Sequence, residues 1–278
     1  MDWTRKVNPA TIAFLLCTLC TTMFGASFRD DFAVVFIDAD SEAKYGTFPL
    51  DRSLLARAIQ KASDLHARGV VLKFFFDLPK AEASDSALAH ALTNLPVVLQ
   101  ARIDDTTTEP NPLPARFTLN GMKPQTEVSG RSGWIPIPRF IANAHDVGFV
   151  DFSSTQVPLL ESYQDHTVKS LVLCCLELAT GKPAVIEPGQ KVKFGNRALQ
   201  LDAHNCIQAK LPMKDELAYI PFDKFLAGDI PARLIQDKIV IIGYDGSQMP
   251  SFSTTIGQVR AHRLFIYDLQ SIYNQLGT

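Results

Sequence analysis

The stretch Leu226-Ala-Gly-Asp-Ile-Pro-Ala-Arg-Leu-Ile-Gln-Asp-Lys-Ile-Val-Ile-Ile-Gly243 decides the fold of this chain. It predicts the end of a helix, a turn fixed by Gly228 and Pro231, and a short amphipathic turn before the polar residues 236–238. A strand follows over 239–242. In this strand, four consecutive β-branched residues follow the polar residues 236–238 and precede Gly243. Such a pattern is typical of a strand that is covered on both faces.

Strand and helix patterns alternate on the N-terminal side of the chain. Short apolar runs predict strands over 33–37, 70–76 and 96–101. Asp51 is an N-cap residue for a helix that we expect to end at Gly69, and a second helix covers 87–92. This alternation indicates a parallel sheet with right-handed crossovers.

The middle of the chain is less regular. Loops are predicted over 104–116 and 122–138, which are rich in proline and polar residues. The remaining predicted elements are a strand over 147–152, a helix over 168–178, a hairpin over 191–201 and a helix over 259–276. We therefore expect an α/β fold: one domain over 29–278, with a mainly parallel β-sheet flanked by helices and a partly antiparallel middle.

Residues 7–28 carry no charge and follow Arg5 and Lys6. As a helix, this segment would be about 33 Å long, which is enough to cross a bilayer core. The positive-inside rule then leaves the body of the chain outside the cytoplasm. Residues 1–28 fit both a cleaved signal peptide and a retained N-terminal anchor. Either way we expect an extracytoplasmic, periplasmic body, attached to the inner membrane by residues 7–28 if the segment is retained.

The composition excludes some classes of function. The net charge is −2 and no cluster of lysine and arginine exists, so nucleic acid is not an expected partner. Cys17 and Cys20 lie in the apolar leader. Adjacent cysteines at 174 and 175 point apart on a helix, so we expect buried thiols and no metal there. A disulfide to Cys206 is allowed in an oxidising compartment but is not implied.

Carboxylates follow three of the predicted strands: Asp38 and Asp40 the first, Asp77 the second, and Asp245 the strand over 239–242. In parallel α/β sheets, the carboxyl ends of the strands border the ligand crevice. If these strands are neighbours, the acids converge there and could bind a cation or a small polar ligand. The alternative is that they cap the loops and helices that follow.

Arg52 and His262 also have two possible roles each. Arg52 could form a bidentate pair with Asp77 or a ligand carboxylate, or an internal ion pair across the mouth of the crevice. His262 could respond to pH or accept an interior hydrogen bond. The chain contains no common hydrolase, metalloprotease, nucleotide-binding or dinucleotide-binding motif. We therefore expect no enzyme and no cofactor.

Six further segments resemble one known family, and they do so in the family's order. They are Ala33-Val-Val-Phe-Ile-Asp38-Ala-Asp40-Ser-Glu42, Gly46-Thr-Phe-Pro49-Leu-Asp-Arg52, Val70-Val-Leu-Lys-Phe-Phe-Phe-Asp77, Glu82 to Leu88 with Asp85, Gly148-Phe-Val-Asp151, and Val259-Arg-Ala-His262 with Asp268. Together with 226–243 they resemble the second class of CHASE-type extracytoplasmic sensory domains, found on cyclases, histidine kinases and serine/threonine kinases. The resemblance runs from about Asp31 to Leu276.

The sequence departs from the family pattern at two positions: Phe48 replaces a tryptophan and Arg260 replaces a glutamate. The family's usual following transmembrane helices and output domain have no counterpart in these residues. The resemblance thus implies a sensory module that binds a ligand or partner and acts through other membrane or envelope proteins. The alternative is a structural subunit of a multiprotein cell-envelope complex. The expected ligand-binding residues are Asp38, Asp40, Arg52 and Asp77.

Overall fold

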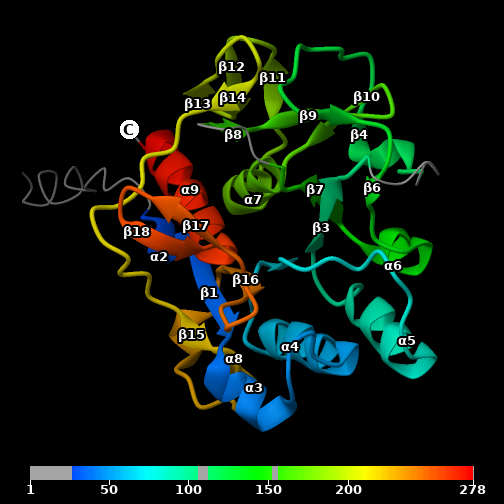
Figure 1. Cartoon of the computed structure of the whole chain (residues 1–278), viewed down its shortest axis with the longest axis vertical. Helices are drawn as coiled ribbons and strands as arrows, with labels where there is room; N and C mark the ends of the chain where they lie inside the picture. The colour runs from blue at the N-terminus through cyan, green and yellow to red at the C-terminus, as the bar shows by residue number, and fades with distance from the viewer. Residues whose placement is uncertain (1–26, 106–111, 152–155, 278) are drawn as a thin grey trace, which may run out of the picture.

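Seven strands form the central sheet, and they come from distant parts of the sequence (Figure 1). β15 (Ile220–Pro221), β1 (Phe32–Ile37), β16 (Ile239–Tyr244), β2 (Gly69–Leu72) and β3 (Val97–Ile103) follow one another, and β6 (Gly133–Trp134) and β7 (Asp146–Phe149) both pair with β3. The pairs are parallel except for β6 with β3. The predicted strand over 239–242 is confirmed as β16, which lies between β1 and β2.

This computed structural model of the chain describes residues 27–105, 112–151 and 156–277. Within these ranges, no helix combines the length and the apolar character that a membrane crossing requires. The predicted N-terminal hydrophobic helix, and with it the choice between signal peptide and anchor, falls almost entirely on residues outside the described ones.

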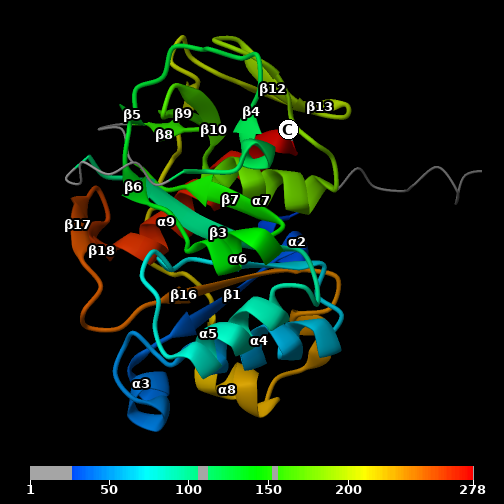
Figure 2. The same ribbon diagram turned by 90° about the vertical axis from the view of Figure 1, so that its right-hand side faces the viewer.

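Alternate residues of each strand enter two separate cores, as expected for strands that are buried on both faces. Val35, Val70 and Val240 pack on one side, and Phe36, Val71 and Ile241 on the other. Figure 2 shows the sheet between the two helix layers. The first layer contains α3 (Ala39–Tyr45), α4 (Arg52–Asp64), α5 (Glu82–Ala91), α6 (Pro138–Asn143) and α8 (Phe222–Ala227).

The second layer contains α2 (Phe28–Asp31), α7 (Leu171–Thr180) and α9 (Ala261–Leu276). In this layer Cys174 and Cys175 are buried, unoxidised thiols, as predicted, and Cys206 is a free thiol too. No disulfide therefore joins Cys206 to either.

The predicted partly antiparallel middle is confirmed. It consists of a four-stranded sheet with one parallel pair, a three-stranded antiparallel sheet and one isolated antiparallel pair, and a second isolated antiparallel pair follows at residues 251–260. The four-stranded sheet contains β4 (Thr118–Leu119), β10 (His166–Lys169), β9 (Leu160–Tyr163) and β5 (Ser129–Gly130). The other strands are β11 (Val185–Glu187), β12 (Lys191–Phe194), β13 (Arg197–Gln200), β14 (Cys206–Ile207) with β8 (Val157–Pro158), and β17 (Ser251–Thr254) with β18 (Gly257–Arg260). The 3₁₀ turns are η1 (Ala115–Phe117) and η2 (Ala232–Leu234).

Two boundaries near β2 differ from the prediction. Helix α4 begins after Asp51 as expected but ends at Asp64, and Gly69 is the first residue of β2 instead of a helix terminator. A Cβ at Gly69 would lie 3.0 Å from the carbonyl oxygen of Pro96, so the glycine permits a close approach to the neighbouring strand. The strand stops at Leu72 and not at 76. Lys73 N–H still donates to the Ile242 carbonyl of β16, at 2.9 Å, and beyond Lys73 the chain leaves the sheet.

Candidate functional site

Asp38 caps the helix that follows β1. Its Oδ1 accepts hydrogen bonds from Ser41 N–H at 3.0 Å and from the Ser41 hydroxyl at 2.8 Å. Asp40 is exposed in the first turn of the same helix, α3. The two residues therefore lie at the predicted end of β1, and Asp38 has the capping role that was the alternative to ligand binding.

Arg52 forms an internal ion pair with Asp85, at 2.6 Å, and donates to the Leu78 carbonyl at 2.7 Å. Its guanidinium lies over the rings of Phe76 and Phe140, with 5.4 and 5.1 Å from Cζ to the ring centroids. Burial raises the pKa of Asp85, but hydrogen bonds from Lys80 N–H and Arg52 outweigh it and leave that pKa below its usual value.

Asp77 is half-buried, and no hydrogen bond or ion pair of its carboxylate is found within the described residues. Asp85, the ion-pair partner of Arg52, was not among the predicted site residues. Its place in one of the segments that resemble the family was the one indication of its role in the sequence. Whether Asp38, Asp40, Arg52 and Asp77 bind a ligand stays a prediction.

Asp245, at the end of β16, is almost fully buried between two arginines of the C-terminal region. Arg263 approaches it with Nε at 2.9 Å and Nη2 at 2.8 Å. Arg260 donates to its carbonyl at 2.7 Å and lies 3.3 Å from its carboxylate. Arg260, which stands where the family has a glutamate, thus helps Arg263 to neutralise the buried carboxylate of Asp245.

A buried polar cluster lies on the α9 side of the sheet. Lys73 Nζ donates to Gln100 Oε1 at 2.9 Å, and burial lowers the pKa of this lysine to about 7. Burial also raises the pKa of Asp268 to about 7, although the Lys73 charge acts in the opposite direction. His262 Nδ1 accepts from Tyr244 N–H at 2.9 Å, and burial, followed by Lys73, holds its pKa well below the usual value. His262 is therefore a neutral interior acceptor.

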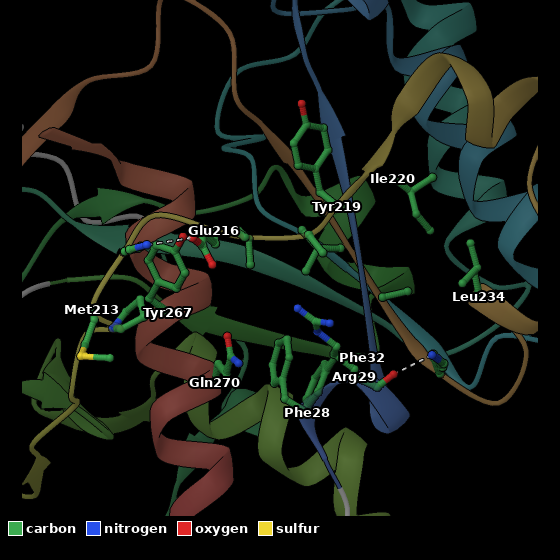
Figure 3. Close-up of a pocket in the computed structure, with 17 residues that line it drawn as sticks. Phe28, Arg29, Phe32, Met213, Glu216, Tyr219, Ile220, Leu234, Tyr267 and Gln270 are labelled. Carbon is green, nitrogen blue, oxygen red and sulfur yellow. Dashed lines mark hydrogen bonds and ion pairs between the residues drawn. The ribbon is translucent and has the colours of Figure 1, made fainter. Parts of the chain in front are cut away.

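A pocket of about 670 Å³ lies beside the start of β1, away from Asp40, Arg52 and Asp77 (Figure 3). Its walls come from α2, β1, the segment 212–220 and α9, with one side closed by Leu234 and Lys238. Most of the wall is apolar. The apolar residues include Phe28, Phe32, Val34, Met213, Leu217, Ile220 and Leu234.

Aromatic packing fixes the floor of this pocket. The rings of Phe28 and Phe32 stack with centroids 4.6 Å apart, and Tyr273 of α9 meets the Phe32 ring edge-on at 5.3 Å. A capping box at Ser27 holds α2 in place, since Ser27 Oγ accepts from Arg29 N–H and Asp30 accepts from Ser27 N–H. The short helix therefore presents its first turn to the pocket.

The strand edge next to the pocket is partly open. β15 pairs only with Val35 and Phe36 of β1, so within the described residues no strand lies beside Phe32 to Val34 on that side. Tyr219 links the pocket to the predicted site, because its ring packs 5.3 Å from that of Phe36 and its hydroxyl donates to Asp38 Oδ2 at 3.5 Å.

The charged residues around the pocket are mainly cationic. Lys238 Nζ donates to the Arg29 carbonyl at 2.6 Å, and Lys214 lies 3.9 Å from Glu216 at the exposed rim. Within the described residues, no carboxylate lies within ion-pair distance of the Arg29 guanidinium, which points into the pocket in Figure 3. An unpaired arginine against an apolar wall can receive an anionic group of a ligand.

A family comparison adds to this geometry. The family model of the CHASE2 domain matches residues 13–269. This chain belongs to the CHASE2 domain family. CHASE2 domains are extracellular sensory domains, which agrees with the expected extracytoplasmic location. No curated protein and no solved structure matches the chain significantly.

Several residues that resemble the CHASE2 pattern have structural roles. Gly148 lets β7 approach α7, because a Cβ there would lie 2.4 Å from Leu171 Cα. Asp151 accepts from Ile103 N–H at 2.8 Å, and His262 and Asp85 have the partners described above. The CHASE2 pattern thus reports on the fold, whereas the pocket is lined largely by other residues.

Proposed function

We propose that this CHASE2 chain is a periplasmic sensory module that binds an amphipathic anion in the pocket beside β1. The ligand would have an apolar body and one carboxylate or phosphate group. The observation that carries the proposal is the Arg29 guanidinium, which has no carboxylate partner in the described residues and borders an apolar pocket of about 670 Å³.

The size and the lining support a small organic ligand. Ligand pockets usually occupy about 300–1,000 Å³, with apolar walls and few polar groups that set orientation. Phe28, Phe32 and Leu217 would contact the apolar body. Arg29 could grip a carboxylate with two parallel N–H donors, and Lys214 and Lys238 would add positive charge.

Signal transfer belongs to the same proposal. The pocket is built from α2 and from Tyr267 and Gln270 of α9, so a ligand would touch both helices at once. Ligand binding would then bias how the two helices pack, and a separate membrane or envelope protein would detect the change. The proposal includes no catalysed reaction and no nucleic acid.

Binding can be tested with 4-phenylbutyrate and its uncharged analogue 4-phenylbutanol on the full chain in lipid nanodiscs. We expect the carboxylate to raise the free energy of unfolding, by about 2.7 kcal/mol at a hundredfold excess over its dissociation constant. Arg29→Met keeps the apolar stem and should remove the preference for the carboxylate. Arg57→Met, at an exposed position of α4, is the matched control. Equal effects of the two compounds on the unaltered chain would contradict the proposal.

The alternative is a structural subunit of a multiprotein cell-envelope complex. The observation in its favour is the exposure of apolar side chains at the pocket mouth: Met213 is 96% exposed and Leu234 is 38% exposed. Purification in mild detergent followed by mass spectrometry separates the two functions. Envelope proteins in a fixed ratio, lost from a Met213→Asp variant, would support the structural subunit.

A further inference from the structure

Three potential metal ligands converge where two loops of the antiparallel middle meet. Glu127 lies in the loop between β4 and β5, and Asp202 and His204 lie in the turn between β13 and β14, near the top of Figure 1. One carboxylate oxygen from each acid and one ring nitrogen of His204 all lie within 4.8 Å of one another. His204 Nδ1 is 3.8 Å from Glu127 Oε1.

Backbone hydrogen bonds hold the turn that carries two of these side chains. Asp202 Oδ1 accepts from His204 N–H at 2.9 Å and from Cys206 N–H at 2.8 Å. Because a single oxygen takes both bonds, the carboxylate is fixed in orientation while its second oxygen keeps its lone pairs for another partner.

A buried asparagine ties the turn to the loop of Glu127. Asn205 is fully buried, and its Nδ2 donates to the Gln125 carbonyl at 2.8 Å while its Oδ1 accepts from Gly189 N–H at 2.8 Å. Its backbone has a φ of 63°, a left-handed conformation that asparagine tolerates better than most residues. The two ligand-bearing segments are therefore held together by contacts that do not involve the ligands themselves.

The charges of the cluster are not balanced by neighbouring cations. Within the described residues, no lysine or arginine lies within ion-pair distance of Glu127 or Asp202. A divalent cation bound by the two carboxylates and the imidazole would supply the positive charge that no neighbouring lysine or arginine in the described part of the chain provides.

We propose that Glu127, Asp202 and His204 bind a first-row divalent transition-metal cation, for which Zn²⁺ is the reference. Zn²⁺ accepts one imidazole nitrogen and two carboxylate oxygens at about 2.0–2.2 Å, which places tetrahedral ligands about 3.4 Å apart. The 3.8 Å between His204 Nδ1 and Glu127 Oε1 needs only a small movement of two partly exposed side chains. The imidazole favours such a metal over Ca²⁺ and Mg²⁺, which prefer oxygen ligands alone.

The site joins two segments that are distant in the sequence, so its expected effect is to clamp the loop of Glu127 to the turn after β13. This effect does not depend on the pocket beside β1 or on any ligand there. Three protein ligands also leave one coordination position for water or for a donor group of a partner.

The test uses the full chain without a histidine tag and with Cys17→Ser and Cys20→Ser, so that the leader thiols cannot bind metal. Zn²⁺ is titrated by calorimetry, and Co²⁺ is followed by its visible absorption. We expect one equivalent of each metal to bind and Zn²⁺ to raise the melting temperature. Glu127→Gln, Asp202→Asn and His204→Gln should each weaken binding at least tenfold. His90→Gln, at an exposed position of α5 far from the turn, should have no effect.

The variants separate loss of ligands from loss of fold. Asp202→Asn keeps an oxygen that can accept the two backbone N–H bonds of the turn, and Glu127→Gln changes an exposed side chain. Circular dichroism without metal should therefore be unchanged in both. The proposal is overturned if the chain binds no stoichiometric metal, or if Glu127→Gln and His204→Gln bind as tightly as the parent.

Discussion

Arg52 Nη1 lies 2.6 Å from Asp85 Oδ1, and the two side chains are only 5% and 3% exposed. The pair connects the first residue of α4 to the first turn of α5. The Arg52 guanidinium also lies against the rings of Phe76 and Phe140 and donates to the Leu78 carbonyl, so this charge deep in the first helix layer has an anionic, a backbone and two aromatic partners.

Removal of one member of this pair should destabilise the fold strongly. Arg52→Ala or Asp85→Ala leaves an uncompensated buried charge, and we expect a loss of about 3–5 kcal/mol in the free energy of unfolding, measured with urea. The double variant Arg52→Met with Asp85→Leu should lose less than the sum of the two single variants. Single-variant losses below about 1 kcal/mol would contradict this account.

Lys73 should make the stability increase with pH above neutrality. Its pKa is lowered by burial to about 7 in the folded chain, against an ordinary value of 10.5. Between these two values the unfolded chain binds more protons, so the free energy of unfolding rises from pH 7 towards pH 10. Denaturation at a series of pH values should show that Lys73→Met flattens this rise, while Lys210→Met, at an exposed position, retains it.

Gly148→Ala tests the contact between β7 and α7. The added Cβ would lie 2.4 Å from Leu171 Cα and 2.8 Å from Leu171 N, so backbone must move. Overpacking of this kind costs about 1–3 kcal/mol or more. Gly121→Ala is the comparison, because it meets no atom within 4 Å and adds only the strain of a φ of 75°, about 1 kcal/mol. A smaller loss for Gly148→Ala than for Gly121→Ala would argue against the tight contact.

Substitution of Asp38 separates its capping role from ligand binding. Asp38→Ala should cost about 1 kcal/mol because Ser41 N–H loses its acceptor, whereas Asp38→Asn should retain most of the stability. If Asp38 acts only as a cap, Asp38→Asn leaves the stabilisation by 4-phenylbutyrate unchanged. A loss of that stabilisation would instead support the ligand-binding role that the sequence predicted for Asp38.

Asp77 needs a separate test, because its carboxylate has no partner within the described residues. Asp77→Ala should keep the free energy of unfolding within about 0.5 kcal/mol, as expected for a side chain without specific contacts. If Asp77 binds a ligand, the variant loses ligand-induced stabilisation while it stays folded. A large loss of stability on its own would show a structural role.

The local chemistry of the sequence predicted the fold class and the central strand β16, but it did not predict the pocket beside β1. The β-branched run in 226–243 identified β16 correctly, since burial on both faces has a visible pattern. Gly69 was misassigned because a glycine that permits close strand approach looks the same in sequence as one that ends a helix. Asp85 was noted only as part of a family-like segment, since an ion pair between two helices depends on how they pack.

The pocket and the cluster of Glu127, Asp202 and His204 have no signature in the sequence. The pocket is assembled from α2, the segment 212–220 and α9, none of which has a pattern that indicates a ligand. Glu127 lies in a loop that is distant in the sequence from Asp202 and His204, so no short spacing of ligand residues along the chain indicates the cluster. Both depend on how the loops pack against the sheet.

The position of β16 has a consequence for the order in which the chain can fold. β1 and β2 are made early in synthesis, but each pairs with β16, and residues 239–244 emerge only after most of the chain. Until then, two hydrophobic strands have exposed edges that could pair with other chains. A chain shortened before residue 239 would keep that gap in the middle of its sheet, so we expect such fragments to aggregate and to need a chaperone during synthesis.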